Sequence, residues 1–332
     1  FLSSIRDVIA TLTNYLNRTD VRRLIDRFGV WLIIALAAVL RLWNLGYPSK
    51  LVFDETYYVK DAWTLWHNGA EKAWPADANV AFESGSVNTY LTDPSFVVHP
   101  PLGKWIIGFG MWLFGAEHSY SWRITTAILG IAAVAILIAI AKLIFKSTAW
   151  ALAAGFLFAI DGHAIVLART ALLDNSLMFF ALLAFYFLLR DQQLRDIDKV
   201  IWFRPWLVAA GLSLGAATAV KWSGMYFIAA FGIYVVVSEA LARRAAGQTG
   251  WLNNGLIKQG AFSFLNLVPV SIVVYLLSWT GWITTSGGYD RNSTDNWFTS
   301  QIEYHQAAYG FHVALATPHS YASNPLSWLF AI

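Results

Sequence analysis

The sequence predicts an all-α protein that crosses a membrane several times. Of its 332 residues, 57% are apolar and only 13% are charged, whereas soluble domains average about 25% charged residues. The apolar residues also form blocks long enough to cross a hydrocarbon core of about 30 Å, which takes roughly 20 helical residues. The chain contains no cysteine, which excludes thiol chemistry and a Cys-bound zinc site.

The apolar blocks give the expected spans in order. The first, 28–45, follows a polar lead of mixed charge at 1–27. Its length and this lead favour a retained helix over a cleaved signal peptide. The further spans are expected at 121–145, 148–160, 166–189, 205–222, 224–242 and 260–283, and a last one begins near Pro325. No internal repeat or low-complexity linker is evident, so we expect 1–332 to form one domain.

The apolar stretch Leu102–Gly115 is too short to cross, and Gly103, Gly108 and Gly110 interrupt it. At that length we expect a helix at the membrane surface. Counting it as a span would invert every later segment and place the basic loops outside.

The distribution of basic residues predicts the orientation. With a cytoplasmic N-terminus, the cytoplasmic segments hold 14 Lys and Arg residues against 7 Asp and Glu residues, and acids predominate elsewhere. Basic segments stay on the cytoplasmic side. We therefore expect a multi-pass protein of the cell membrane, with 1–27 cytoplasmic and two outer loops, 47–120 and 284–324.

Ionisable residues gather at the outer ends of the expected spans. They are Arg41, Asp54, Glu55, Arg123, Asp161, His163, Arg169, Asp174 and Lys221. A charge at the bilayer centre costs roughly 2.5–3.5 kcal/mol, so such residues are usually paired or line a wet cavity. Their convergence predicts one polar cavity on the outer face. A carboxylate there suits proton abstraction from a hydroxyl, and the cations suit a phosphate. This set favours glycosyl transfer from a lipid-phosphate sugar.

Structural roles are the alternative for several of these residues. Asp54 is also suited to cap the helix expected near Thr56, where the helix dipole favours an acid. Asp161 has the same alternative at the Asp161-Gly162-His163 break. Arg169 with Asp174 is a possible ion pair within one helix, although i,i+5 is a poor spacing for that.

The His99-Pro100-Pro101-Leu102-Gly103-Lys104 stretch carries two further candidates. His99 is either a site residue or part of a turn, since a residue before proline is held extended. Lys104 is either a phosphate contact or a side chain that snorkels from an interfacial helix. Glu303 and His305 are two apart and would diverge by roughly 200° on one helix, which argues against a metal site built on both.

Motifs along nearly the whole chain resemble those of protein O-mannosyltransferases. The first loop carries Leu40-Arg41-Leu42-Trp43-Asn44-Leu45 with Pro48, then Phe53-Asp54-Glu55-Thr56-Tyr57-Tyr58 and the His99–Lys104 stretch. In the family's order there follow Trp122-Arg123, Arg169-Thr170-Ala171-Leu172-Leu173-Asp174 and Lys221-Trp222-Ser223-Gly224. Tyr275–Trp282 and His319–Pro325 are similar to the bacterial, actinobacterial-type branch.

The resemblance implies a GT-C-type transmembrane bundle whose large first outer loop carries juxtamembrane helices. It implies transfer of mannose from polyprenyl-phosphate mannose to Ser or Thr of exported proteins, with inversion at the sugar. Asp54 is then the base, Glu55 and Arg123 complete the catalytic group, and Lys221 contacts the phosphate. The further candidates for substrate binding are Arg169, Asp174, His99, Lys104, Asp161 and Trp222.

The same resemblance implies the partners. These are the lipid donor, secreted or membrane protein acceptors with the Sec translocon, and membrane lipids, but no nucleic acid. No spacing specifies a metal site, although the outer acids are suited to bind Mg²⁺ or Mn²⁺ through oxygen. The chain lacks the β-trefoil insert of eukaryotic members. The family continues through more spans, so we expect C-terminal spans to be missing from this chain.

Two alternatives stay open on sequence alone. The first is a glycosyltransferase of the same superfamily with a lipid or cell-wall polysaccharide as acceptor. The second is a transporter, in which ionisable residues and broken helices usually lie near the midplane of two related halves. The charges of this chain gather at one face instead, which favours an enzyme.

Overall fold

A computed structural model describes residues 19–316, 324, 326 and 327 of the chain. These residues form helices joined by loops, and no strand longer than a single bridge is present among them. The helices are α2 (Thr19–Leu42), α3 (Glu55–Asn68), α4 (Ala78–Glu83), α5 (Leu102–Phe114), α6 (Ser119–Phe145), α7 (Thr148–Ile160), α8 (Gly162–Ala168), α9 (Leu173–Leu194), α10 (Pro205–Val220), α11 (Gly224–Ala245), the π-helix η1 (Leu252–Gln259), α12 (Gly260–Ser278), α13 (Thr280–Thr284) and α14 (Trp297–Ala314).

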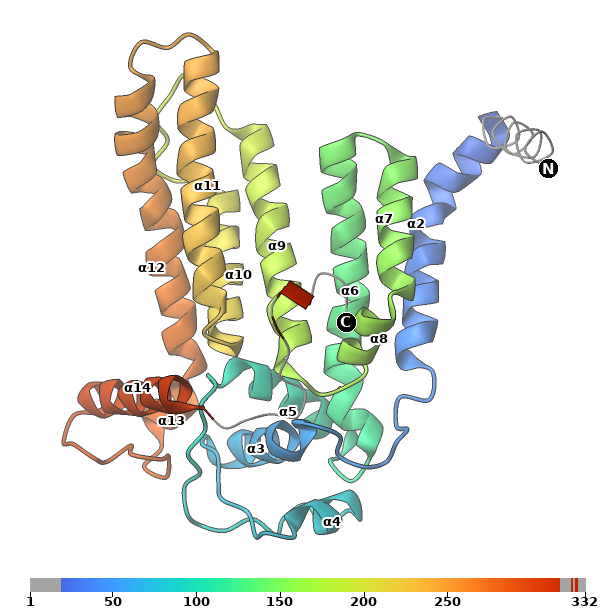
Figure 1. Cartoon of the computed structure of the whole chain (residues 1–332), viewed down its shortest axis with the longest axis vertical. Helices are drawn as coiled ribbons and strands as arrows, with labels where there is room; N and C mark the ends of the chain where they lie inside the picture. The colour runs from blue at the N-terminus through green and yellow to red at the C-terminus, as the bar shows by residue number, and fades with distance from the viewer. Residues whose placement is uncertain (1–18, 317–323, 325, 328–332) are drawn as a thin grey trace.

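The long helices run side by side, and the short ones lie across one end of them (Figure 1). Helices α2, α6 and α7 form one group and α9 to α12 the other, with α6 and α9 in contact between the groups. Helices α3, α4, α5, α13 and α14 lie at the end where α2 stops. The short α6–α7, α9–α10 and α11–η1 connections lie at the opposite end. Both expected outer loops are therefore at the same end of the bundle.

Among the described residues, four helices are long and apolar enough to cross a membrane: α6, α9, α11 and the continuous Leu252–Ser278 helix. The bent pair α7 and α8 is a possible fifth. Helix α10 is apolar but has 16 residues. Helix α2 carries Asp26, Arg27 and Arg41 within its last 18 residues. As expected, the Leu102–Phe114 stretch is a short helix, and it packs between α3 and α6.

Two of the expected spans have wrong boundaries. The span expected at 166–189 begins only at Leu173, because α8 is a separate helix bent by 62° from α7 and residues 169–172 turn the chain. The span expected at 260–283 begins instead at Leu252 and ends at Ser278. Hydropathy does not reveal the turn at 169–172, because the residues of α8 before it and of α9 after it are mostly apolar. The span expected from Pro325 lies outside the described residues.

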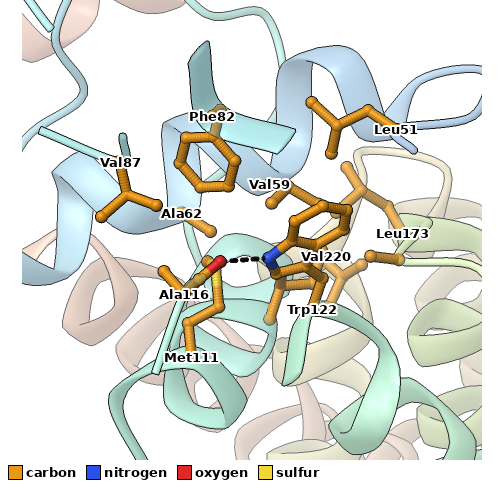
Figure 2. Close-up of a cluster of buried hydrophobic side chains, with 12 residues drawn as sticks. Leu51, Val59, Ala62, Phe82, Val87, Met111, Ala116, Trp122, Leu173 and Val220 are labelled. Atoms are coloured by element: carbon orange, nitrogen blue, oxygen red, sulfur yellow. Dashed lines mark hydrogen bonds between the residues drawn. The ribbon is translucent and has the colours of Figure 1, made fainter. Parts of the chain in front are cut away.

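The first of the expected outer loops, 47–120, shares its hydrophobic core with the ends of the long helices (Figure 2). Leu51 and Val59 of the loop pack in one buried cluster with Leu173 of α9 and Val220 of α10. The Trp122 indole N–H at the start of α6 donates to the carbonyl of Ala116, at 2.7 Å. Burying one such large side chain contributes about 1.5–3 kcal/mol. The cluster fixes Asp174 and Lys221, which directly follow Leu173 and Val220. It also fixes the segment between Leu51 and Val59 that carries Asp54.

Close packing explains two glycines of this region. A Cβ on Gly103 would lie 2.5 Å from a Leu173 methyl and 3.2 Å from a Val220 methyl. Only glycine therefore lets α5 pack this tightly against α9 and α10. Gly224 is similarly confined, since its Cβ would lie 2.3 Å from the Thr218 backbone nitrogen. Gly103 therefore sets how closely α5 lies to the residues before Asp174 and Lys221, and Gly224 sets the tight turn between α10 and α11.

A buried ion-pair network ties the opposite end of the bundle together. Arg204, which precedes α10, pairs with Asp191 of α9 and lies 3.6 Å from Glu239 of α11. Glu239 also accepts from Arg243 at 3.0 Å. The four side chains are at most 6% exposed. The basic segments of this end are thus held by structural pairs between helices.

Candidate active site

Asp54 immediately precedes α3 without capping it. Its backbone is right-handed helical, and its side chain accepts no bond from the first turn. Among the described residues, the carboxylate has one hydrogen-bond partner, the Tyr58 hydroxyl at 3.4 Å. The preceding Phe53 has φ of +52° and is 72% exposed. For a residue other than glycine this conformation costs of the order of 1–3 kcal/mol. The capping alternative for Asp54 is therefore not realised, and its carboxylate is free to accept a proton.

Glu55, next in the chain, is fully buried and paired with Arg123 of α6. The guanidinium donates to both carboxylate oxygens at 2.7 Å, and the backbone N–H groups of Val52 and Ala171 donate to the same oxygens at 3.0 and 2.8 Å. Arg123 also donates to the carbonyls of Leu45, Pro48 and Lys50. Every polar atom of the pair is engaged. The pair joins the first loop, α6 and the α8–α9 turn directly behind Asp54.

Lys221 and Asp174 form an ion pair that remains open to solvent. Lys221 ends α10 and Asp174 lies in the first turn of α9, with Nζ and Oδ1 2.9 Å apart. Their side chains are 26% and 46% exposed. An exposed pair contributes only about 0.2–1 kcal/mol. The ammonium can therefore exchange Asp174 for a phosphate at little cost.

Tyr58 and His99 connect Asp54 to this ion pair. The two rings lie 6.0 Å apart. Burial, and then the charges of Asp54 and Asp174, raise the pKa of Tyr58. Burial, and then the charge of Lys221, lower the pKa of His99 to about 3. The charges of Asp54 and Asp174 both act on Tyr58, and those of Lys221 and Asp174 both act on His99. Asp54, His99, Asp174 and Lys221 therefore belong to one site, in which His99 is neutral.

Arg169 makes no pair with Asp174. Its guanidinium instead donates to the carbonyls at the end of α2, which are those of Leu40, Arg41, Trp43 and Asn44. A cation at a helix C-terminus interacts favourably with the helix dipole. The sequence alternative of an Arg169–Asp174 ion pair is therefore wrong, and Arg169 closes α2 against the α8–α9 turn.

Lys104 is buried behind the site rather than exposed in it. It is 1% exposed, lies 2.5 Å from Glu71, and donates to the carbonyl of His99 at 3.1 Å. Burial raises the pKa of nearby Asp61 to about 7, although the charge of Lys104 opposes the shift. In this structure Lys104 holds His99 in place and has no face open to a phosphate.

Asp161 caps α8, which is the alternative that the sequence left open. Its carboxylate accepts the Ala164 N–H at 2.7 Å, and its side chain is otherwise exposed. Replacing a capping Asp by Ala costs about 1 kcal/mol. We therefore expect Asp161→Ala to lower the free energy of unfolding by about that amount and to leave substrate affinity unchanged. Thermal unfolding and steady-state kinetics of the variant measure both, and a large rise in KM would restore a binding role for Asp161.

Trp222 follows Lys221 and separates the polar site from an apolar cavity. Its indole N–H donates to the Tyr275 hydroxyl at 3.0 Å. The cavity of about 550 Å³ is lined by Thr218, Trp222, Met225, Ile228, Ala229, Val268, Ser271, Ile272, Tyr275, His305 and Tyr309. It lies between α10, α11 and α12, and α14 closes one side of it with His305 and Tyr309. The surface exposed to the cavity is apolar. Its size and lining suit a hydrocarbon chain.

Several site residues were not predicted from the sequence. Tyr58 had a signal, because it lies four residues after Asp54 and so shares its helix face. Glu71 had none, since it reaches the site from another segment of the first loop. Tyr275 lies in one of the motifs of the resemblance, and His305 was considered only as a metal ligand, so neither was predicted to line the site. Within the described ranges, no three His, Asp or Glu side chains converge to hold a metal ion.

Known proteins resemble the chain in sequence. Residues 118–281 match the model of the family described as dolichyl-phosphate-mannose-protein mannosyltransferase. A polyprenol-phosphate-mannose–protein mannosyltransferase of Mycolicibacterium smegmatis is 32% identical over 348 residues, covering 92% of this chain and 63% of that protein. One of the same description from Corynebacterium glutamicum is 32% identical, covering 90% and 62%. The chain thus spans less than two thirds of the length of these relatives.

Solved structures resemble it in fold. The Pmt1–Pmt2 protein O-mannosyltransferase complex of S. cerevisiae, bound to the sugar donor, aligns with a TM-score of 0.62 and 19% identity, over 81% of this chain and 36% of that one. The Archaeoglobus fulgidus oligosaccharyltransferase aligns at 0.54 and 16%, over 91% and 36%. The fold is therefore that of the GT-C membrane glycosyltransferases. Within that class, the chain belongs to the protein O-mannosyltransferase family.

Proposed function

We propose that this protein transfers mannose from polyprenyl-phosphate mannose to Ser or Thr hydroxyls of exported proteins. The observation that carries the proposal is Asp54, a carboxylate without a capping bond at the mouth of a site that also holds Lys221. The apolar cavity next to Lys221 adds a place for a lipid chain. The names of the mycobacterial and corynebacterial relatives supply the sugar and the acceptor class.

In this mechanism Asp54 removes the proton from the acceptor hydroxyl. The oxygen then forms a bond to the anomeric carbon of mannose while the bond from that carbon to the phosphate oxygen breaks. The electron pair leaves on the polyprenyl phosphate, and the β-linked donor gives an α-mannoside. Glu55 and Arg123 do not touch the reactants, since all their polar atoms are bonded within the protein. They are positioning residues that hold the loop carrying Asp54.

Lys221 balances the charge that grows on the departing phosphate. Such preorganised charge stabilises the transition state more than the ground state. The prenyl chain occupies the cavity between α10, α11 and α12, so the phosphate lies beside Lys221 and Trp222. Asp174 holds the ammonium in place until the donor arrives. His99, being neutral, adds no charge to the site.

We further propose that the site faces outward from the cell membrane. The α6–α7, α9–α10 and α11–η1 connections share the end opposite the site (Figure 1). Basic residues lie in the first two connections and in the last turn of α11, which carries Arg243 and Arg244, and basic segments stay in the cytoplasm. Acceptors would reach the site as unfolded chains leaving the Sec translocon. Labelling of single cysteines placed at Lys146 and Asp290 by an impermeant reagent in intact cells tests the orientation. Labelling at position 290 alone is expected, and labelling at position 146 alone would invert it.

Lys221→Ala is expected to lower kcat/KM for the lipid donor and to leave the acceptor KM nearly unchanged. A charge-assisted hydrogen bond contributes about 1.5–3 kcal/mol, so kcat/KM for the lipid donor should fall roughly 10- to 150-fold. Lys221→Arg, which keeps the charge, should recover part of the loss. The acceptor KM should stay within about twofold. Steady-state kinetics with each substrate varied in turn measure these values, and an unchanged donor kcat/KM in Lys221→Ala would remove the phosphate role.

A further inference from the structure

A directed chain of hydrogen bonds runs from Trp222 through Tyr275 to His305 of α14. The indole N–H can only donate, so the Tyr275 oxygen accepts it at 3.0 Å. The Gln301 carbonyl can only accept, so His305 Nδ1 carries the ring proton and donates it there, at 2.7 Å. The Nε2 of the neutral imidazole then carries no proton, and it accepts the Tyr275 hydroxyl proton at 2.6 Å.

His305 also stacks on the residue that it supports. Its ring lies 5.7 Å from that of Trp222 in a nearly parallel arrangement. His305 and Tyr275 both line the 550 Å³ cavity and also a second apolar cavity of about 410 Å³ between α12 and α14. The hydrogen-bonded Tyr275 and His305 side chains thus form part of the wall between these two cavities. Trp222 forms the end of the first cavity beside Lys221.

The second outer loop is attached to the first near the same point. The Tyr304 hydroxyl, one residue before His305, donates to the Val97 carbonyl at 2.8 Å and accepts the Val97 N–H at 3.1 Å. Val97 lies two residues before His99. Helix α14 therefore contacts both the polar side and the lipid side of the site. It is the one described element of the second outer loop that can couple them through its own side chains.

We propose that His305 is a positioning residue that fixes the Trp222 indole through Tyr275, and so shapes the cavity for the first isoprene units of the lipid donor. The proposal rests on the proposed function, because it takes the cavity as the site of the prenyl chain. It adds a role for the second outer loop, which is donor binding. His305 does not touch the reacting atoms.

The bond network requires neutral His305, which predicts a pH dependence of donor binding. Burial lowers the pKa of His305 from its usual 6.5, and the groups facing it are the rings of Trp222, Tyr275, Trp279 and Tyr304, none of them charged at neutral pH. A group whose pKa is lowered on folding contributes its full stabilisation above its unfolded pKa, about 6.5. The contribution is lost as the pH falls through the lower, folded-state pKa. Donor KM should therefore rise with acidification.

The test compares His305→Ala with His305→Gln in the full-length protein. The Gln amide oxygen can accept the Tyr275 proton where Nε2 does, so His305→Gln should keep the donor KM within about twofold at pH 7 and lose its acid dependence. His305→Ala should raise the donor KM roughly five- to tenfold, the loss of one hydrogen bond, with kcat within about twofold. Tyr275→Phe should reproduce this effect with α14 unchanged. Equilibrium binding of polyprenyl phosphate should weaken in parallel.

His67 supplies the matched control. It makes the same local bond, from Nδ1 to the Trp63 carbonyl at 2.9 Å, but lies exposed on α3. His67→Ala should leave donor KM and its pH dependence unchanged. A donor KM unaffected by both His305→Ala and Tyr275→Phe would overturn the inference while wild-type transfer persists. Absence of transfer by the wild type, with polyprenyl phosphate still bound, would instead overturn the proposed function.

Discussion

Asp54→Asn is expected to abolish mannosyl transfer while the protein keeps its fold and its affinity for the lipid. A positioned general base contributes roughly 10²–10⁴-fold to the rate, and an amide cannot take the proton. Within the part of the chain that the structure describes, the carboxylate has one long hydrogen bond, from Tyr58 at 3.4 Å, so its loss should not destabilise α3. Single-turnover transfer rates, the binding of polyprenyl phosphate and thermal unfolding measure the three quantities.

Asp77 provides the control for this experiment. It precedes α4 as Asp54 precedes α3, makes no capping bond either, and is exposed. Asp77→Asn should therefore retain the wild-type rate. Transfer at the wild-type rate by Asp54→Asn would eliminate Asp54 as the base. A folded but lipid-free Asp54→Asn protein would show that the residue binds the donor instead.

Arg123→Ala is expected to destabilise the protein more strongly than the substitutions at Asp54, Asp161, Lys221 or His305. It leaves the Glu55 charge buried without its partner, and breaking such a pair costs about 3–5 kcal/mol. It also frees three loop carbonyls, those of Leu45, Pro48 and Lys50. We expect a lower unfolding temperature in detergent and a first loop that is readily cleaved by protease. Activity should fall because Asp54 loses its fixed position.

A double variant separates this structural role from a catalytic one. Glu55→Gln with Arg123→Met removes both charges and should recover part of the stability lost in Arg123→Ala. The exposed pair of Asp196 and Lys199 gives the comparison, because Lys199→Ala should cost no more than about 1 kcal/mol. An Arg123→Ala protein with wild-type stability but no activity would show that Arg123 acts on the substrate directly.

The helices and the convergence of charges were predictable from the sequence. Apolar runs long enough to span a membrane show in hydropathy alone, and α6, α7 and α11 begin within a few residues of their expected starts. The α8–α9 turn was not predictable. This turn is held by Arg169, which donates to carbonyls at the end of α2 and just after it, 125 or more residues away in the sequence.

For the individual site residues as well, some roles were predictable from the sequence and others were not. Asp54 and Lys221 lie where a loop or helix end exposes them, so their positions in the sequence already indicated a site. Lys104 was indistinguishable from a phosphate ligand, because its partner Glu71 comes from another segment of the first loop. His305 lies on α14, and only its contact with Tyr275 distinguishes it from the exposed Glu303 two residues earlier.

The measurement that tests the central claim most directly is transfer from polyprenyl-phosphate mannose by the full-length protein in detergent. A Ser/Thr-rich peptide and a lipid extract are offered together, with and without EDTA, and mass spectrometry locates the sugar. The account predicts one hexose on a Ser or Thr oxygen of the peptide. Loss of transfer in EDTA, with recovery on adding Mg²⁺ or Mn²⁺, would add a metal ion to the site. Mannose found only on lipid or glycan, with the peptide unmodified, would contradict the account.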